Sequence, residues 1–283
     1  MEGWNFYNHA FIPATAPHEE PDISFIESGK IWKCKEKAFF ARFTTDFDCG
    51  YETPFWCCIK DDAFDIDSLK AKRRYEVNKG NKNYYTKKLF PNDIESMYTV
   101  YLESIKGYSN PSIEAKEDFA VKWLKSLSSE NTLMLGAFSK DTDLLCGFAH
   151  IPMHGRYIPI SSFKTMVCEE KNGVNFALAY GICEYFREKL EKKEVYLCDG
   201  YRNILHETNF QNWLIKYFGF RRAYCNLHLI YRPIFGFFIK IAFPFKKLII
   251  RIVPKSFGAY FKAIFNMEEW SRQCKKLKKE RKV

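Results

Sequence analysis

The fold is decided by residues 172–233, which read NGVNFALAYGICEYFREKLEKKEVYLCDGYRNILHETNFQNWLIKYFGFRRAYCNLHLIYRP. The first third of this stretch predicts a helix, because Val174, Leu178 and Ile182 recur at four-residue spacing and form one apolar face. Residues 194–199 follow as a short apolar run that ends in Asp199 and a glycine. Such a run is typical of a buried strand whose carboxyl end reaches solvent.

The second half of the stretch predicts another helix and another strand. Thr208 and Gln211 have the spacing of a capping box, and an apolar stripe with helical period follows as far as Phe218. Residues 223–231 then alternate between apolar and polar side chains until Pro233 closes the pattern. Helix, strand, helix and strand are therefore expected in close succession.

Upstream residues add strands and helices in mixed order. We expect strands at 38–45, 54–60, 84–89, 133–138, 144–151 and 157–166, and helices at 67–80, 92–107 and around 119–127. This order predicts an α/β fold with a mixed sheet (α+β). The turn-rich residues 1–30 are expected to lie across the body as an extended arm.

This layout resembles the GNAT superfamily of N-acyltransferases, in which a central hairpin leads into a donor-binding helix and then strand, helix and strand. Within it, the chain looks most like the Fem-type (FemAB-like) aminoacyl or acyl transferases of bacterial envelope or polysaccharide synthesis. Three segments carry the closer likeness, namely the basic residues 68–74, Asn172 to Asn175, and Asp199 with Gly200. The resemblance implies a GNAT-like acyl-CoA N-acyltransferase fold with an N-terminal extension and a basic amphipathic C-terminal tail.

The same resemblance implies a donor site. Backbone N–H groups of a splayed central strand would stabilise the oxyanion, and the start of the long helix would hold the donor. The residues so implied are Ile160, Ser161, Ser162, Phe163, Asn172, Gly173, Asn175 and Asn209.

The start of the long helix departs from the CoA-binding pattern. Glu170 stands where that pattern has a glutamine or arginine, and Asn175 where it has a glycine or alanine. The usual acid tyrosine of the last helix is Ile215. Standard acetyl-CoA chemistry is therefore not the default, and the donor is expected to be an acyl-CoA or an aminoacyl-tRNA.

Amide formation needs a base, since an amine of pKa about 10.4 is only on the order of 0.1% neutral at pH 7. Ligands of open α/β sheets bind at the carboxyl ends of strands, which makes Asp199, Tyr201, His206 and Glu207 the catalytic candidates. Each has a structural alternative. Asp199 is either a base or a residue that stabilises its loop. Tyr201 is either a proton donor or an aromatic residue packed in the core. His206 either carries a proton in the reaction or lies on the surface.

Two further sets are candidates for substrate binding. Arg73 and Arg74 lie on the basic helix, which is either a cradle for a phosphate-bearing substrate or a solvated face. Asp46 and Asp48 lie in the turn after the strand at 38–45.

Composition argues against a disordered, a disulfide-rich and a membrane-spanning protein. With 47% hydrophobic and 18% aromatic residues among 283, the chain can bury a substantial core. The ten cysteines contain no Cys-x-x-Cys pair and predict reduced thiols, with one reactive cysteine as the alternative. No metal site is expected. The first residues lack the features of a signal peptide, and no long apolar run occurs, so we expect a cytoplasmic protein.

The positive charge lies in residues 234–283. This segment has 13 basic and 3 acidic residues, while the other 233 residues have 31 of each. Phenylalanines and isoleucines alternate there with lysines and prolines, which suits the interface of an anionic membrane. Nucleic acid is an unlikely partner apart from tRNA. A tail folded onto its own core, or into a dimer, is the structural alternative.

We therefore expect a domain at 55–233, preceded by an arm with strands at 1–54 and followed by the tail at 234–283. The expected function is an N-acyltransferase or aminoacyltransferase acting on an amine of an envelope or polysaccharide precursor at the inner membrane face. The alternatives are an acetyl-CoA-dependent acetyltransferase on a soluble amine and a catalytically silent scaffold. The sequence does not predict an oligomeric state.

Overall fold

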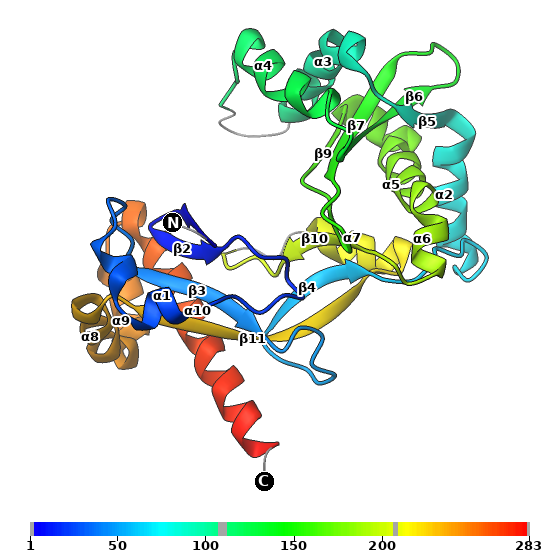
Figure 1. Ribbon diagram of the computed structural model, residues 1–283. Coiled ribbons are helices and arrows are strands. Elements are labelled where there is room, and N and C mark those ends of the chain that lie inside the picture. Colours follow the sequence, from blue (N-terminus) through cyan, green and yellow to red (C-terminus); the bar gives the residue numbers. More distant parts are fainter. Residues whose placement is uncertain (1–2, 107–111, 206–208, 282–283) are drawn as a thin grey trace. The chain divides into compact units, whose positions relative to one another are not determined.

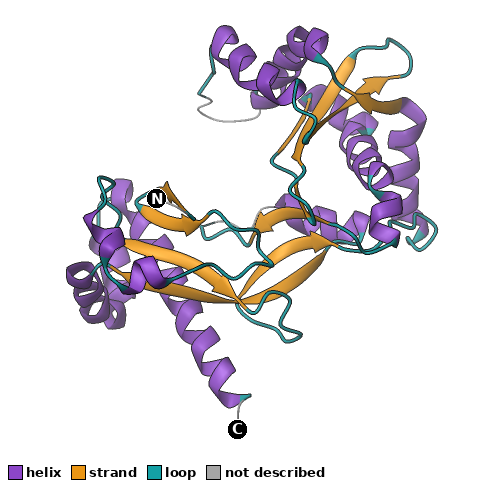
Figure 2. Cartoon of the chain, viewed as in Figure 1, coloured by secondary structure: helices purple, strands orange, loops and turns teal. Residues whose placement is uncertain are grey.

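The computed structural model describes residues 3–106, 112–205 and 209–281 (Figure 1). Both helices and strands occur along these residues, in runs of one to several elements of a kind (Figure 2). Contacts divide the chain into two compact units. Unit 1 comprises residues 1–58, 201–208 and 222–283, and unit 2 comprises 59–200 and 209–221. The units are defined by contacts between residues. The division into 1–54, 55–233 and 234–283 expected from the sequence remains a prediction.

Unit 1 is built on a mixed sheet with the strand order β1-β2-β3-β11-β4. β1 and β2 form an antiparallel hairpin, β2 runs parallel to β3, and β3 pairs with β11 in antiparallel register. The expected N-terminal arm is thus part of the sheet. The elements are β1 (Trp4–Tyr7), β2 (Ala10–Pro13), α1 (Ser24–Glu27), η1 (Lys30–Lys33), β3 (Phe40–Thr45), β4 (Phe55–Lys60), β11 (Arg221–Tyr231), α8 (Pro233–Ala242), η4 (Phe243–Phe245), α9 (Lys246–Ile252) and α10 (Lys255–Glu280).

Two apolar clusters form the core of unit 1, because successive strand residues point to opposite faces of the sheet. Ala41 and Phe43 of β3 pack with Trp4, Phe11 and Ile26. The neighbouring Phe40 belongs to the other cluster, and Met267 and Cys274 of α10 are buried there. The second half of the expected tail is therefore part of the core of unit 1.

Unit 2 contains a four-stranded antiparallel sheet with the order β5-β6-β7-β9 and a parallel pair, β8 with β10. Phe148 of β7 packs in the cluster of α3 and α4, whereas the adjacent Gly147 faces Val174 of α5. The helices thus cover both faces of the sheet. The elements are α2 (Ala71–Asn83), β5 (Tyr84–Lys88), η2 (Pro91–Asp93), α3 (Ile94–Ile105), α4 (Lys116–Leu127), β6 (Thr132–Ser139), β7 (Leu145–Pro152), β8 (Tyr157–Pro159), β9 (Ser162–Thr165), η3 (Val167–Asn172), α5 (Val174–Tyr185), α6 (Arg187–Glu191), β10 (Tyr196–Tyr201) and α7 (Asn209–Phe218).

The mixed α/β fold class is confirmed, since parallel and antiparallel strands alternate with helices. The hairpin β6-β7 leads through α5, β10 and α7 to β11, which is the order that the resemblance implies. Three predicted boundaries were wrong. The strand at 157–166 is two strands, the long helix is divided near Phe186, and the basic helix continues past Gly80 to Asn83.

Gly80 lies inside α2 because α2 and α5 cross there without space for a side chain. A Cβ atom on Gly80 would lie 2.6 Å from the carbonyl oxygen of Gly173 and 2.9 Å from the nitrogen of Ala177. Gly173, with φ 93°, occupies the left-handed region that favours glycine and caps α5. The two glycines therefore allow direct contact between the backbones of the helices.

Candidate functional site

The central feature of unit 2 is a strand that changes partners. Residues 157–159 of β8 pair with β10, while residues 162–165 of β9 pair with β7. At the junction, the N–H of Ile160 donates to the carbonyl of Cys198 (2.8 Å), and the N–H of Ser161 donates to that of His150 (2.9 Å). This is the splayed strand expected from the sequence. The N–H groups of Ile160 and Ser161 are both used within the fold, so they are not the oxyanion donors that the resemblance implies.

Asp199 lies immediately beside this junction, since it follows Cys198 in β10. Burial raises the pKa of its carboxyl to about 7, and a hydrogen bond from Gln211 acts in the opposite direction. Gln211 is itself buried, on the first turn of α7. A carboxyl with this pKa can exchange a proton near neutral pH. Its role as a base, expected from the sequence, remains a prediction.

A cavity of about 390 Å³ adjoins the junction, and Asp199 is not among the residues that line it. Ser161, Ser162 and Lys164 line it from the strand, and His150 lines it from β7. Lys122 and Trp123 of α4 form part of the opposite wall. The cavity thus combines two ammonium groups, four hydroxyl groups, the carboxylate of Glu114, an imidazole and an aromatic surface.

His150 is a feature of the site that sequence reasoning did not identify. Burial, and then the charge of Lys122, lower the pKa of its imidazole, which keeps the ring neutral at pH 7. The ring meets Trp123 edge to face, with their centroids 5.1 Å apart. The buried indole N–H of Trp123 has no hydrogen-bond partner among the described residues. The sequence did contain one indication of this residue, since His150 is a histidine in an otherwise apolar predicted strand.

The start of α5 does not fit the pyrophosphate of CoA. Gly173 is in contact with Gly80, and two side chains of α2 donate to the preceding carbonyls, Lys79 to Lys171 (2.7 Å) and Asn83 to Asn172 (2.9 Å). Helix α2 therefore covers the turn that binds phosphate in the implied family. Asn172, Gly173 and Asn175 lie at this helix start as expected, and the buried side-chain oxygen of Asn175 has no partner among the described residues.

The remaining predicted donor and phosphate-binding residues of unit 2 lie around α7 and α2. Phe163 packs against Phe210 (centroids 4.9 Å apart), and Asn209 is the exposed first residue of α7. Arg73 donates to the carbonyl of Lys216 (3.1 Å), and Arg74 pairs with the exposed Asp67 (3.4 Å). Both guanidinium groups thus already contact the protein.

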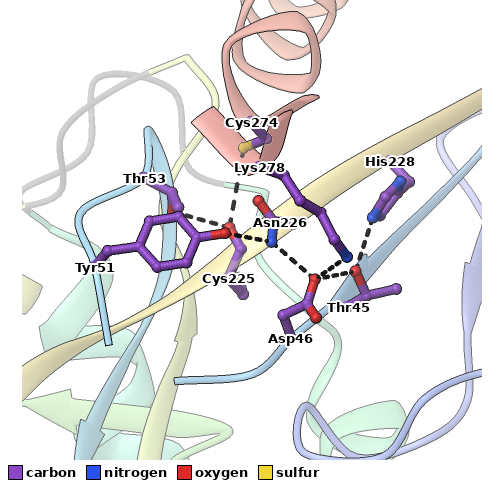
Figure 3. Close-up of polar contacts among 9 residues, drawn as sticks. All are labelled: Thr45, Asp46, Tyr51, Thr53, Cys225, Asn226, His228, Cys274 and Lys278. Atoms are coloured by element: carbon purple, nitrogen blue, oxygen red, sulfur yellow. Dashed lines mark hydrogen bonds and ion pairs between the residues drawn. The ribbon is translucent and has the colours of Figure 1, made fainter. Parts of the chain in front are cut away.

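Asp46 and Asp48 belong to unit 1, both with φ 55°, a left-handed conformation that aspartate tolerates. Asp46 accepts hydrogen bonds from Lys278 (2.6 Å), Asn226 (2.8 Å) and Thr45 (3.0 Å), as Figure 3 shows. The bond from Lys278, with smaller contributions from Asn226 and Thr45, lowers the pKa of Asp46 to about 2. Its carboxylate therefore anchors α10 on the sheet, which is a structural alternative to substrate binding.

Tyr201 also belongs to unit 1, where its hydroxyl is 2.9 Å from that of Thr44 and its ring stacks on Phe55. This arrangement matches the packed-aromatic alternative. His206 and Glu207 lie outside the described residues. Among the described residues, no three histidine, cysteine or acidic side chains are placed to hold a metal ion. None of the ten cysteines, all of which are among the described residues, forms a disulfide.

No protein-family model matches the sequence, and no curated protein matches it significantly. Solved structures give partial likenesses. An N-acetyltransferase, PaiA of Thermoplasma acidophilum in complex with coenzyme A, is 22% identical, with 38% of this chain and 73% of that chain covered and a TM-score of 0.32. The C-terminal domain of a protein assigned as lysylphosphatidylglycerol synthetase from Agrobacterium fabrum is 10% identical (84% and 83% covered, TM-score 0.49). L-PGS from Bacillus licheniformis is 16% identical (81% and 79% covered, TM-score 0.47).

Proposed function

We propose that the chain is an N-acyltransferase in which the carboxylate of Asp199 accepts a proton from an amine. The observation that carries the proposal is the carboxyl of pKa about 7 beside the splayed strand. A base is most effective when its pKa lies near the working pH, because it is then both ionised and basic enough to take the proton. A surface aspartate of pKa about 3.9 would be a much weaker base.

The reaction is a transfer of an acyl group to nitrogen. The ammonium form of the acceptor loses one proton to Asp199, and its lone pair attacks the acyl carbon. A nitrogen–carbon bond forms, the bond from that carbon to the leaving oxygen or sulfur breaks, and the leaving group departs with the electron pair and takes up the second proton that the nitrogen loses. In this proposal the hydroxyl of Ser161 is the oxyanion donor, because Ser161 follows Ile160 at the junction, where Ile160 is bonded to Cys198 next to Asp199.

The donor in this proposal is an activated acyl ester, with aminoacyl-tRNA as the candidate, rather than an acyl-CoA. The support is the packing of α2 over the start of α5, which leaves the backbone of Gly173 against Gly80. A pyrophosphate held at that turn would have to displace α2. The chain would thus resemble the FemAB-like aminoacyltransferases in its choice of donor.

A test of the donor uses the full chain with a diamine acceptor and either labelled acetyl-CoA or labelled aminoacyl-tRNA. We expect labelled amide from the aminoacyl ester and none from acetyl-CoA. Asp199→Asn should lower the yield of product by roughly 10²-fold or more, and Asp141→Asn, which changes an exposed aspartate in the β6-β7 turn, should not. Turnover of acetyl-CoA alone would refute the choice of donor. Absence of amide with both donors would favour a catalytically silent scaffold.

The acceptor in this proposal is the amine of a cell-envelope or polysaccharide precursor at the cytoplasmic face of the membrane. The support is a surface on α8, η4, α9 and the start of α10 in unit 1, which we term the apolar–cationic surface. Exposed apolar residues there include Ile234 at 73% and Ile252 at 72%. The other large ones are Phe237, Phe238, Ile241, Phe245, Leu248, Ile250, Phe257 and Tyr260.

Cations lie among these apolar groups. Lys240, Lys247, Arg251 and Lys262 are exposed, and Lys246 pairs with Glu269 (2.8 Å). Apolar groups that enter the headgroup layer, with cations beside anionic phosphates, are typical of peripheral membrane helices. Among the described helices, none is long and apolar enough to cross a membrane.

Sedimentation with vesicles tests this surface. The full chain should bind vesicles rich in anionic lipid more strongly than neutral vesicles, and Phe237→Ser with Phe238→Ser should release it. Phe90→Ser is the matched control, because Phe90 is similarly exposed at 56% but lies in unit 2. If the double variant sedimented as well as the wild type, the membrane proposal would be wrong.

A further inference from the structure

A second pocket lies within unit 1, and an arginine without an acidic partner lines it. Arg42 is on β3, and the pocket, with about 90 Å³ open to small molecules, is formed by β3, Tyr201 and the loop after β2. Phe43 and Phe55 supply buried aromatic walls, and the hydroxyl groups of Thr44 and Tyr201 face the same pocket. All of these residues belong to unit 1.

The guanidinium group of Arg42 has five N–H donors but makes one weak contact within the described part of the chain. Its Nη1 lies 3.8 Å from the Sδ of Met267, and no carboxylate of the described residues lies within salt-bridge distance. Burial lowers the pKa of Arg42, while Tyr201 and Tyr7 act weakly in the other direction. Arg42 is half-buried, and a partly desolvated guanidinium without an anion costs free energy, which an anion in the pocket would offset.

We propose that this pocket binds one anionic group, a phosphate or carboxylate, of a small ligand. Arg42 would hold the anion through two parallel N–H donors, and the hydroxyl of Thr44 or Tyr201 would add a third. A volume of about 90 Å³ suits a single such group. The site is independent of Asp199, because it lies in the other unit and uses none of the same residues.

Glu19 sets the selectivity of the pocket. It lies at the exposed rim, where its Oε2 accepts a hydrogen bond from the N–H of Ala16 (2.9 Å). Its negative charge opposes binding of an anion, but solvent screens an exposed charge more than a buried one. Arg42 therefore dominates inside the pocket, and Glu19 weakens the affinity without abolishing it.

Thermal unfolding of the full chain tests the proposal, since a ligand that binds only the folded state raises the Tm in a saturable way. Sodium phosphate is titrated against sodium chloride at constant ionic strength. Glycerol phosphate, as the headgroup of a lipid, and acetate are titrated in parallel. We expect the Tm to rise with phosphate and to level off at high concentration. A larger rise with glycerol phosphate than with phosphate would indicate a lipid headgroup as the source, and a larger rise with acetate would indicate a carboxylate ligand.

Four variants decide which residue is responsible. Arg42→Met should weaken anion binding at least tenfold and leave the Tm without ligand unchanged or higher, because it removes an unpaired buried charge. Arg42→Lys should bind weakly, since it keeps the charge but loses the fork of donors. Glu19→Gln should bind more tightly, as its amide oxygen can still accept from Ala16. Arg222→Gln, which removes an exposed arginine of the same unit, should behave as the wild type.

Three results would overturn the proposal. The first is a Tm that does not respond to any of the three anions. The second is a rise that persists in Arg42→Met, which would show binding elsewhere. The third is a Tm of Arg42→Met well below that of the wild type without ligand, which would show that the guanidinium already has its partner in the fold.

Discussion

At the scale of single residues, Asp199 links chemistry to stability. Its pKa is 3.8 in an exposed chain and about 7 in the fold, so the folded state binds the proton more tightly. The free energy of unfolding therefore falls as the pH rises from about 4 to 7, by up to roughly 4 kcal/mol for a shift of this size. Chemical denaturation of the wild type at several pH values should show this slope.

Asp199→Asn should remove both the pH dependence of stability and the proposed catalysis of amide formation. Asparagine cannot ionise, so the variant should be more stable than the wild type at pH 8 and similar at pH 4. Its kcat/KM for amide formation should fall by roughly 10²- to 10⁴-fold and lose the rise near pH 7. Asp141→Asn should retain the slope and the rise. A variant that is destabilised at pH 8 would show that the carboxylate is bound as an anion in the fold.

The sequence predicted the position of Asp199 but not its properties. An apolar run that ends in Asp-Gly marks the carboxyl end of a strand, and that pattern is local. The raised pKa comes from burial of the carboxyl within the fold, against the effect of the hydrogen bond from Gln211, and no pattern around Asp199 encodes that burial. His150 was missed for the same reason, since Trp123 and Lys122 approach it from a distant helix.

At the scale of elements, α10 is attached to unit 1 by the ion pair of Lys278 with Asp46. The folded pKa of Asp46, about 2, lies below its ordinary 3.8, so the pair stabilises the fold above pH 4 and ceases to do so as the pH falls through 2. Because both side chains are more than a third exposed, we assign it only about 1 kcal/mol.

Lys278→Gln should therefore lower the free energy of unfolding by about 1 kcal/mol at pH 7. The difference from the wild type should vanish below pH 2, where Asp46 is mostly protonated in both proteins. Urea denaturation measures it. Lys276→Gln removes a lysine that is 78% exposed on the same helix and should have little effect. An equal loss in both variants would mean that general charge, rather than this pair, fixes α10.

The contact of α2 with α5 gives a second prediction at this scale. Gly80→Ala should destabilise the protein by about 3 kcal/mol, because a methyl group would collide with the backbone of α5. Gly258→Ala in α10 should instead stabilise it by roughly 0.5 to 1 kcal/mol, since nothing lies within 4 Å of the added Cβ. Thermal unfolding of both variants checks the contrast, and tolerance of alanine at residue 80 would contradict the packing.

The helix that was expected to end at Gly80 shows what a local pattern cannot supply. A glycine after a basic, weakly apolar helix is a normal end signal. Here the glycine is needed at a crossing with residues almost a hundred positions later, and α2 continues for three residues beyond it. The alternation of β11, by contrast, depends on its own period, and Ala223, Cys225, Leu227 and Leu229 are buried as it predicts. Asn226 is the exception, because this polar position of the pattern is also buried.

At the scale of the whole molecule, residues 234–283 contain an exposed part and a buried part, which composition alone did not distinguish. Its apolar–cationic surface is exposed, whereas Phe265, Met267 and Cys274 of α10 are buried. A chain that ends at Pro233 would lose these groups and expose Leu227 and Phe55, each worth about 1.5 to 3 kcal/mol when buried.

We therefore expect this truncated chain to lose the fold of unit 1. Hydrogen exchange should show fast exchange of the amides of β3 and β11, while the β6-β7 hairpin of unit 2 remains protected. A chain that ends at Glu280 keeps the buried residues and should exchange like the full chain. Full protection of β3 in the chain that ends at Pro233 would show that α10 is dispensable.

The pairing of β3 with β11 can form only late in synthesis, because the two strands lie far apart in the sequence. Thr45 and His228, which share a hydrogen bond, are 183 residues apart in the chain. A ribosome adding about 5 to 20 residues per second needs roughly ten to forty seconds to cover that distance. During that time the β2-β3 strands have left the exit tunnel without their main partner, and β11 is translated almost last. Nascent unit 1 is therefore a natural client for chaperones, whereas the β6-β7 hairpin can form as soon as it emerges.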